Sequence, residues 1–201
     1  MRVIGGELRR RVLKAPEGMA TRPTSDRLRE TLFNVLAARR EGVGLDGLRF
    51  LDLYAGSGAV GIEALSRGAR EAVFVEKAAG ALKVLKGNID ALDLGPRSRV
   101  QSAGVGSFLR SRMGRFDLVF LDPPYEEAGE YAAALGLLGG EAAGILADGA
   151  LVVAEHRRRD RLAEQYGALR RTRLLEQGDA GLSFYSTGRA EPETSPQSGE
   201  E

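Results

Sequence analysis

A glycine-rich turn between an apolar strand and a helix constrains this chain more than any other feature of its sequence. The segment LDLYAGSGAVGIEAL covers residues 51–65 and contains the pattern GxGxxG at Gly56, Gly58 and Gly61. Glycine permits a sharp turn and a close approach of ligand to backbone, and the amides that begin the next helix point at that ligand. The segment therefore predicts an α/β protein that binds a ligand at this turn.

Strand-like and helix-like segments alternate after residue 49, which is the pattern of a parallel sheet with helices on both faces. The runs that read as strands are 49–53, 72–75, 99–101, 116–121, 150–153, 168–175 and 182–186. We predict a Rossmann-like sheet of about seven mostly parallel strands, the last of them antiparallel. The expected organisation is an N-terminal extension at 1–45, a core domain at 46–188 and a disordered acidic tail at 189–201.

The N-terminal extension is expected to form a small β-hairpin followed by one helix. Residues 2–9 read as two short extended runs around a turn at Gly5-Gly6. Thr24 or Ser25 is suited to cap a helix, because apolar residues recur after it at helical spacing. The opposite side of that helix is polar, so it is either an RNA-facing surface or an ordinary solvated face.

Two acidic residues beside the glycine turn indicate which ligand it binds. Glu76 lies twenty residues beyond Gly56, at the end of the next strand, where a carboxylate can accept both hydroxyls of a ribose. Asp52 ends the strand before the turn, where it would repel a pyrophosphate but suit the ammonium and sulfonium of S-adenosylmethionine. The prediction is therefore S-adenosylmethionine as cofactor, with a nicotinamide oxidoreductase as an alternative that only the glycine pattern and Glu76 support.

A second motif, Asp122-Pro123-Pro124-Tyr125, follows the strand-like run 116–121. The prolines have no amide hydrogen, so the Asp122 carboxylate and the Pro123 carbonyl are presented as acceptors, which suits a substrate NH2 group. An exocyclic amine on a nucleic-acid base is a weak nucleophile, and two acceptors would orient its lone pair for methylation. Tyr125 offers an aromatic face for an extruded base. The motif predicts the catalytic site of an amino-methyltransferase.

Composition excludes several other chemistries. The chain has no cysteine, so disulfides, thiolate metal sites and cysteine nucleophiles are excluded. Its single histidine, His156, cannot build a multi-histidine metal site and is expected to be structural, so we predict no metal. No apolar run approaches the roughly 18 residues of a membrane helix, and the arginine-rich start does not resemble a secretory signal. We therefore expect a cytoplasmic protein with no membrane partner.

Charge is distributed unevenly, although the formal net charge is only +1. Residues 1–40 contain ten Lys or Arg against four acidic residues, and residues 156–175 contain seven against two. Basic segments suit a polyanion, because lysine and arginine displace counterions from phosphates. The pattern favours nucleic-acid binding, with a solubilising surface as the alternative.

Taken with these residues, the chain resembles the bacterial family of small-subunit (16S) ribosomal RNA guanine-N2 methyltransferases. The resemblance runs over residues 2–187 and rests on RVIGG at 2–6, RPTSDRLRETLFN at 22–34, LDLYAGSGAVGIEAL at 51–65 and DPPY at 122–125. It implies a class I S-adenosylmethionine-dependent methyltransferase fold and N2-methylguanosine as the product. Its implied partner is ribosomal RNA within an assembling small ribosomal subunit. Nothing in the sequence resembles a dimer seam, so we expect a monomer.

The resemblance also implies roles for individual residues. The residues expected to bind the cofactor are Asp52, Tyr54, Ala55, Gly56, Ser57, Gly58, Glu76, Lys77, Gly104 and Val105. The residues expected to bind the target amine are Asp122, Pro123, Pro124 and Tyr125. The residues expected to bind RNA are Arg2, Arg9, Arg10, Arg11, Arg22, Thr24, Arg27 and Arg29. Two positions depart from the family pattern: Gly104 stands where relatives often have an acid near the adenine, and Arg10 interrupts a common Arg-Gly-Arg sequence.

Two other functions remain open on the sequence. An adenine-N6 or glutamine-N5 methyltransferase can also use an acceptor followed by Pro-Pro-aromatic, although the chain has no room for a separate DNA-recognition domain. A non-catalytic RNA-binding assembly factor is the alternative from a different class, and the complete glycine turn and Asp122 argue against it.

Overall fold

The sheet dominates the architecture in the computed structural model, which describes residues 1–15, 25–39, 44–124 and 129–188. The helices are α1 (Asp26–Ala38), α2 (Ala59–Ser66), α3 (Ala79–Ala91), α4 (Val105–Arg110) and α5 (Gly129–Leu138), with short 3-10 turns at Gly95–Arg97 and Ala143–Ile145. The strands are β1 (Arg49–Leu53), β2 (Glu71–Glu76), β3 (Ser98–Ser102), β4 (Phe116–Leu121), β5 (Leu146–Arg157), β6 (Gln165–Tyr166), β7 (Leu169–Gln177) and β8 (Ala180–Ser186). None of the described helices is both long and apolar enough to cross a membrane.

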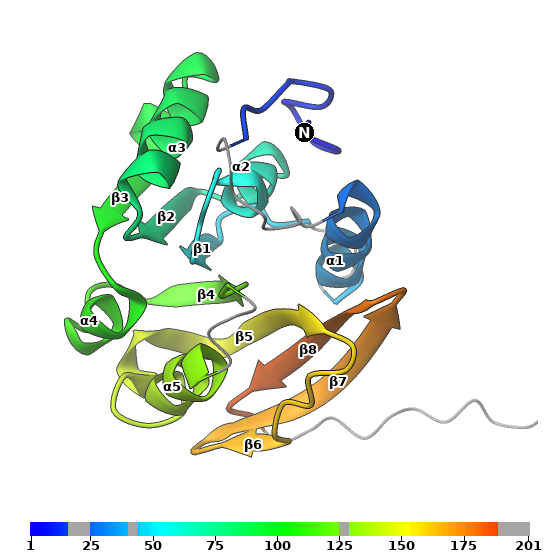
Figure 1. The fold of residues 1–201 in the computed structure, drawn as a ribbon, viewed down its shortest axis with the longest axis vertical. Helices are drawn as coiled ribbons and strands as arrows, with labels where there is room; N and C mark the ends of the chain where they lie inside the picture. Colours follow the sequence, from blue (N-terminus) through cyan, green and yellow to red (C-terminus); the bar gives the residue numbers. More distant parts are fainter. Residues whose placement is uncertain (16–24, 40–43, 125–128, 189–201) are drawn as a thin grey trace, which may run out of the picture.

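All eight strands belong to one sheet with the order β3-β2-β1-β4-β5-β8-β7-β6 (Figure 1). The first five strands pair in parallel, and β8 pairs antiparallel with both β5 and β7. The mostly parallel sheet with an antiparallel last strand is therefore confirmed, and within the described residues the two-residue β6 is added to the seven strands expected. Because the chain continues from β1 to β2 on one side and returns to β4 on the other, the sheet has a switch point between β1 and β4. Open α/β sheets bind ligands at the carboxyl ends of strands around such a point.

Helices cover both faces of the sheet, as predicted (Figure 1). One buried cluster joins apolar residues of α1, α2 and α3 to one face of the sheet, and a second joins α4 and α5 to the other face. The period-2 alternation of the strands divides them between the clusters, since Phe120 belongs to the first and Leu121 to the second. The faces are therefore buried separately, and the strand ends are left for the site.

The N-terminal hairpin forms, but with a wider turn than the one expected at Gly5-Gly6. Arg2 pairs antiparallel with Val12, and residues 3–11 make the connection between the paired positions. Gly6 has φ +74, and a Cβ placed there would lie 1.8 Å from the carbonyl oxygen of Ser66 on α2. The glycine pair thus lets the hairpin lie directly against α2 instead of closing the hairpin tightly.

A buried carboxylate on α2 attaches the hairpin to the core. The side chain of Glu63 is fully buried and accepts hydrogen bonds from the amides of Ile4 and Gly5, each at 2.8 Å. It also accepts from Arg67 Nε at 2.7 Å, and Arg29 Nε lies 3.8 Å from it. Such a carboxylate is stable in the interior only because these donors and cations replace water.

The N-terminal extension shares the core of the sheet. Val3, Leu13 and Leu45 are buried in the same apolar cluster as Phe50 of β1. Helix α1 also packs there, and Ser25 Oγ caps it by accepting a hydrogen bond from the Leu28 amide at 3.1 Å. The expected tail at 189–201 lies outside the described residues.

His156 is structural, as expected. It is 3% exposed in β5, its Nδ1 donates to the Arg157 carbonyl oxygen at 2.9 Å, and its Nε2 lies 2.9 Å from Ser183 Oγ. Both ring nitrogens therefore have partners within the sheet.

Replacing Glu63 with alanine is expected to lower the free energy of unfolding by about 3–5 kcal/mol, because buried Arg29 would keep only the half-exposed Asp26 as counter-charge and the amides of Ile4 and Gly5 would lose their acceptor. Urea denaturation of the variant, with the exposed α1 residue Glu30→Ala as control, measures the loss. A loss no larger than that of Glu30→Ala would show that the buried carboxylate does not hold this part of the fold.

Candidate active site

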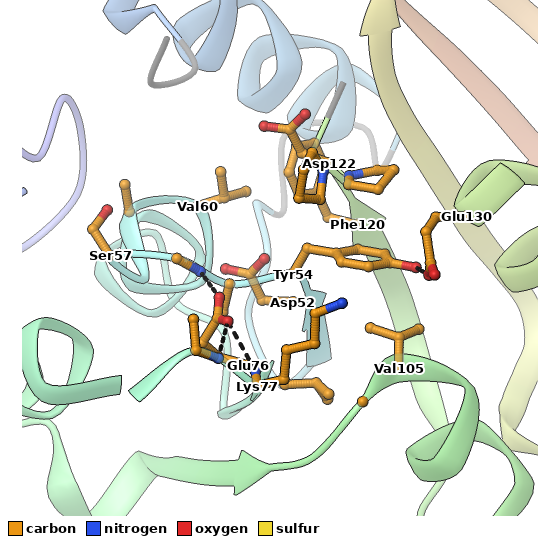
Figure 2. Close-up of a pocket in the computed structure, with 18 of the residues that line it drawn as sticks. Asp52, Tyr54, Ser57, Val60, Glu76, Lys77, Val105, Phe120, Asp122 and Glu130 are labelled. Carbon is orange, nitrogen blue, oxygen red and sulfur yellow. Dashed lines mark hydrogen bonds between the residues drawn. The ribbon is translucent and has the colours of Figure 1, made fainter. Parts of the chain in front are cut away.

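A pocket of about 480 Å³ opens at the carboxyl ends of β1, β2 and β4, beside the switch point of the sheet (Figure 2). Many of the residues singled out in the sequence line it together. They are Asp52, Tyr54, Ala55, Gly56, Ser57, Glu76, Lys77, Gly104, Val105, Asp122, Pro123 and Pro124. Gly58, the N-cap of α2, is not among the residues that line the pocket, and Tyr125 lies outside the described residues.

The glycine turn has the shape that its sequence predicts. Gly58 has φ +81, a conformation that side-chain-bearing residues rarely adopt, and a Cβ there would lie 2.4 Å from Leu85 Cδ1. A Cβ on Gly61 would lie 2.3 Å from a ring carbon of Phe74. The glycines therefore bring the turn and the start of α2 close to β1 and β2, so that Gly56 and Ser57 face the pocket.

Four carboxylates lie on one face of the sheet at the ends of four neighbouring parallel strands. In spatial order they are Glu76 on β2, Asp52 on β1, Asp122 after β4 and Glu155 on β5. Each follows by two positions a buried residue of the same apolar cluster, respectively Phe74, Phe50, Phe120 and Val153. Because side chains alternate between faces with a period of two, the four carboxylates project toward the same side. Three of them surround one cavity in Figure 2.

Glu76 is held by three backbone amides. Its Oε2 accepts from the Gly56 amide at 2.9 Å, and its Oε1 accepts from the amides of Lys77 and Ala78, each at 2.8 Å (Figure 2). These bonds tie the glycine turn to the end of β2. A carboxylate has about four acceptor sites, and the three amides use three of them, so one site on Oε2 remains for a ligand hydroxyl.

Two of the carboxylates are difficult to ionise without a cation. Asp52 is 2% exposed and accepts from the Gly61 amide at 2.8 Å. Burial raises the pKa of Asp52 to about 8, the nearby Glu76 charge adds to the rise, and the Gly61 hydrogen bond opposes it. Burial and the charges of Glu155 and Asp52 raise the pKa of Asp122 well above its ordinary value. A bound cation would compensate this concentration of negative charge.

The opposite wall of the pocket contains a contact that the sequence did not reveal. Tyr54, with φ +63, extends its ring across the cavity and donates from its hydroxyl to Glu130 Oε2 at 2.5 Å (Figure 2). Glu130 lies in the first turn of α5, far from any recognised motif. Gly104 and Val105 close the pocket nearby, and a Cβ on Gly104 would meet no atom within 4 Å.

Two residues of the N-terminal hairpin segment, Met1 and Ala15, also line the pocket. From its sequence the hairpin was expected to bind RNA alone, because nothing in the local pattern shows where a hairpin docks. The arginines of the segment are exposed and suggested a surface role, whereas its few buried apolar residues form no pattern that predicts a docking place.

The residues expected to bind RNA do not share one environment. Arg2, Arg9, Arg10, Arg11 and Arg27 are exposed, while Arg22 and Thr24 lie outside the described residues. Arg29 is fully buried: its Nη2 donates to the Arg2 carbonyl oxygen at 2.6 Å and to Asp26 at 2.9 Å. The expectation that Arg29 contacts RNA is therefore wrong. Its guanidinium is the internal counter-charge of Glu63, and helical spacing placed it on the inner side of α1.

Known proteins resemble this chain along most of its length. Residues 1–186 match the family described as conserved hypothetical protein 95. "Putative rRNA methyltransferase YlbH" of Bacillus subtilis (strain 168) is 39% identical over 92% of this chain and 98% of its own length. "Ribosomal RNA small subunit methyltransferase D" of Escherichia coli (strain K12) is 41% identical over 77% of this chain and 74% of its own length.

A solved structure supports the same relationship. The "Putative methyltransferase yhhF from Escherichia coli" superposes with a TM-score of 0.79 at 34% identity, covering 92% of this chain and 96% of that chain. The predicted Rossmann-like methyltransferase fold is thereby confirmed.

The ligand-free protein is expected to lose stability as the pH rises from about 4 to about 8, because folded Asp52 retains a proton that the unfolded chain releases in this window. Asp52→Asn replaces this carboxyl group with an amide that does not titrate. Relative to wild type, the variant should therefore be more stable by on the order of 3 kcal/mol more at pH 8 than at pH 5. Urea denaturation at several pH values, with exposed Asp90→Asn as control, measures this. Parallel pH profiles for wild type and Asp52→Asn would contradict it.

Proposed function

The chain belongs to the family described as conserved hypothetical protein 95, and on that premise we propose that it methylates the exocyclic N2 amine of a guanine in small-subunit ribosomal RNA, with S-adenosylmethionine as methyl donor. One observation carries the proposal. Asp122, Pro123 and Pro124 line the same pocket as the glycine turn and the Glu76 and Asp52 carboxylates. Acceptors for an amine and groups suited to a cationic nucleoside cofactor therefore meet in one cavity.

The residues of the pocket fit S-adenosylmethionine. A volume of about 480 Å³ suits a ligand of this size, which falls within the ordinary range of small-molecule sites. Glu76, at the end of β2, would accept a ribose hydroxyl at the remaining site on Oε2, and Asp52 would face the cationic methionine end. The turn residues Tyr54, Ala55, Gly56, Ser57 and Gly58, together with Lys77, Gly104 and Val105, would complete the site. When bound, the cofactor supplies an electrophilic methyl group on a sulfonium.

Charge supports this cofactor over a dinucleotide. Burial, and after it the charges of neighbouring carboxylates, raise the pKa values of Asp52 and Asp122, so both groups ionise more easily when a cation is near. A cation at this place would be stabilised and a pyrophosphate would be repelled. The resemblance of the loop to dinucleotide-binding turns therefore does not extend to the electrostatics of the site.

The DPP segment would prepare the amine for reaction. Pro123 and Pro124 offer no amide hydrogen, so the Asp122 carboxylate and the Pro123 carbonyl can each accept one hydrogen of the NH2 group. This would turn the nitrogen lone pair out of conjugation and toward the methyl group. Asp122 would then take the proton that the nitrogen loses, and its raised pKa makes its carboxylate a stronger base near neutral pH. Tyr125 would stack on the extruded base.

Ribosomal RNA is the substrate class that the basic residues and the relatives favour. Arg2, Arg9, Arg10, Arg11 and Arg27 are exposed in the part of the chain that also reaches the pocket. With Arg22 and Thr24, they would bind phosphates of RNA in an assembling small subunit, and we propose that the protein acts as a monomer.

Asp122→Ala is expected to reduce methyl transfer to small ribosomal subunits by about 10²–10⁴-fold, since it removes an amine acceptor and a proton acceptor together. The measurement uses labelled S-adenosylmethionine, subunits lacking the modification, and mass identification of the labelled nucleoside. N2-methylguanosine from wild type alone supports the proposal. Labelled N6-methyladenosine, or label on protein, would replace the guanine assignment, and full activity of the variant would exclude the Asp122 role.

Arg9→Ala and Arg10→Ala are each expected to weaken RNA binding and to reduce the slope of log Kd against log salt by about 1, because each removes one phosphate contact. Arg115→Ala is the matched control, since Arg115 is exposed immediately before β4, at the amino end of that strand, where it pairs with Asp148 of β5. Equal slopes for all three variants and wild type would place the RNA surface elsewhere.

A further inference from the structure

The N-terminal hairpin is attached to two helices of the core at separate places. On α2, Ser66 Oγ accepts from the Leu8 amide at 2.9 Å and donates to the Gly5 carbonyl oxygen at 2.6 Å, next to the bonds of Glu63. On α3, Asn88 binds Lys14, which follows the second hairpin strand. The connection of the hairpin is therefore fixed to α2, and the segment that follows its second strand is fixed to α3.

Asn88 joins the hairpin to the glycine turn through one side chain. It is 3% exposed, and its Oδ1 accepts from the Lys14 amide at 2.9 Å. Its Nδ2 donates to the Lys14 carbonyl oxygen at 3.0 Å and to the Ser57 carbonyl oxygen at 2.9 Å. Both hydrogens of the amide are thus used, one toward the hairpin and one toward the turn. Only a side chain with a donor and an acceptor at this place can make all three bonds.

The hairpin segment reaches the pocket beside this connection. Met1 and Ala15, at the two ends of the hairpin, line the same cavity as Ser57 and Glu76. Ser57 Oγ lies 3.7 Å from Met1 Sδ, in hydrogen-bonding geometry. The hairpin therefore forms part of the pocket wall, and the glycine turn has contacts with it on two sides.

The same hairpin carries exposed cations on its outer side. Arg9 and Arg10 lie in its turn, and Arg11 directs Nη2 to the carbonyl oxygen of Ala91, one helical turn beyond Asn88 on α3, at 3.0 Å. A polyanion bound across these arginines would hold the hairpin in its docked position. In that position Met1 and Ala15 complete the pocket.

We propose that Asn88 is a positioning residue that couples RNA binding on the hairpin to cofactor binding in the pocket. This inference rests on the proposed function. RNA and cofactor both favour the docked hairpin, so each raises the affinity of the protein for the other, and by thermodynamic linkage the two effects are equal. Asn88 transmits the effect because its amide is the hydrogen-bonded connection between Lys14 and Ser57.

The test measures the dissociation constant of S-adenosylhomocysteine, which binds without reacting, in the absence and presence of small ribosomal subunits lacking the modification. For the wild type, subunits are expected to lower the Kd about fivefold or more. For Asn88→Ala, the Kd without subunits should rise about three- to tenfold, because the Ser57 and Lys14 groups lose their partner. Subunits should then change the Kd of this variant little, although the variant still binds them.

Matched variants separate this role from general stability. Asn88→Asp keeps an acceptor for the Lys14 amide but has no donor for the two carbonyl oxygens, so it should behave like Asn88→Ala. Asp90→Ala, exposed on the same helix, should behave like wild type. Thermal denaturation shows which proteins are folded at the temperature of the binding experiment.

A second pair of variants tests whether the hairpin forms part of the cofactor pocket, without altering a buried residue. Ala15→Phe enlarges a side chain that lines the pocket and should weaken S-adenosylhomocysteine binding, whereas Val12→Phe lies on the same strand at a position 78% exposed and should not. This pair gives an answer even if both Asn88 variants fail to fold.

The outcomes separate the inference from the function on which it rests. Wild type that binds both ligands independently, or an Ala15→Phe variant with unchanged affinity, overturns the inference and leaves the methyltransferase proposal intact. Folded Asn88→Ala with wild-type affinity and a wild-type response to subunits also overturns it. Wild type that binds neither S-adenosylhomocysteine nor subunits overturns both.

Discussion

Parallel strands end at a common edge, and the site depends on this constraint. Glu76, Asp52, Asp122 and Glu155 are separated widely in sequence, yet parallel pairing brings them together on one face. The register pairs Asp52 with Phe74 and Phe120, so Glu76 and Asp122 each lie two positions further along the neighbouring strands. Burial, together with repulsion from neighbouring carboxylates, makes Asp52 and Asp122 costly to ionise in the ligand-free protein. The buried carboxylates lower the stability of the protein without ligand and favour the binding of a cation, which is an example of the trade-off between stability and function.

The N-terminal extension illustrates how one segment serves both core and surface. Glu63 and Arg29 form a buried ionic contact beneath it, while Arg9 and Arg10 remain in solvent. Such a buried pair contributes little net stability by itself, because desolvation opposes attraction, but it specifies geometry. Here the geometry is that of a hairpin laid against α2 and α3, with its ends at the pocket.

Local pattern predicted much of the fold. The limits of β1 and β4 agree with the apolar runs 49–53 and 116–121, since strands buried on both faces read as continuous apolar segments. Arg29 was wrongly expected to bind RNA, because the charge of a residue on an amphipathic helix does not show whether a buried acid faces it. The acid in question, Glu63, is 34 positions away in the sequence. Glu130, Met1 and Ala15 were missed for a related reason, as each reaches the pocket through packing between segments distant in sequence.

The sequence by itself determined the class of fold, the glycine turn, and the choice of Asp52, Glu76 and the DPPY segment as candidate site residues. These depend on residue type and spacing within short stretches. Only the tertiary structure decided that Arg29 is internal, that Tyr54 meets Glu130, and that Asn88 joins Lys14 to Ser57. Each of these contacts requires the relative placement of helices, strands and hairpin, which the packing of the whole core determines and no local period encodes.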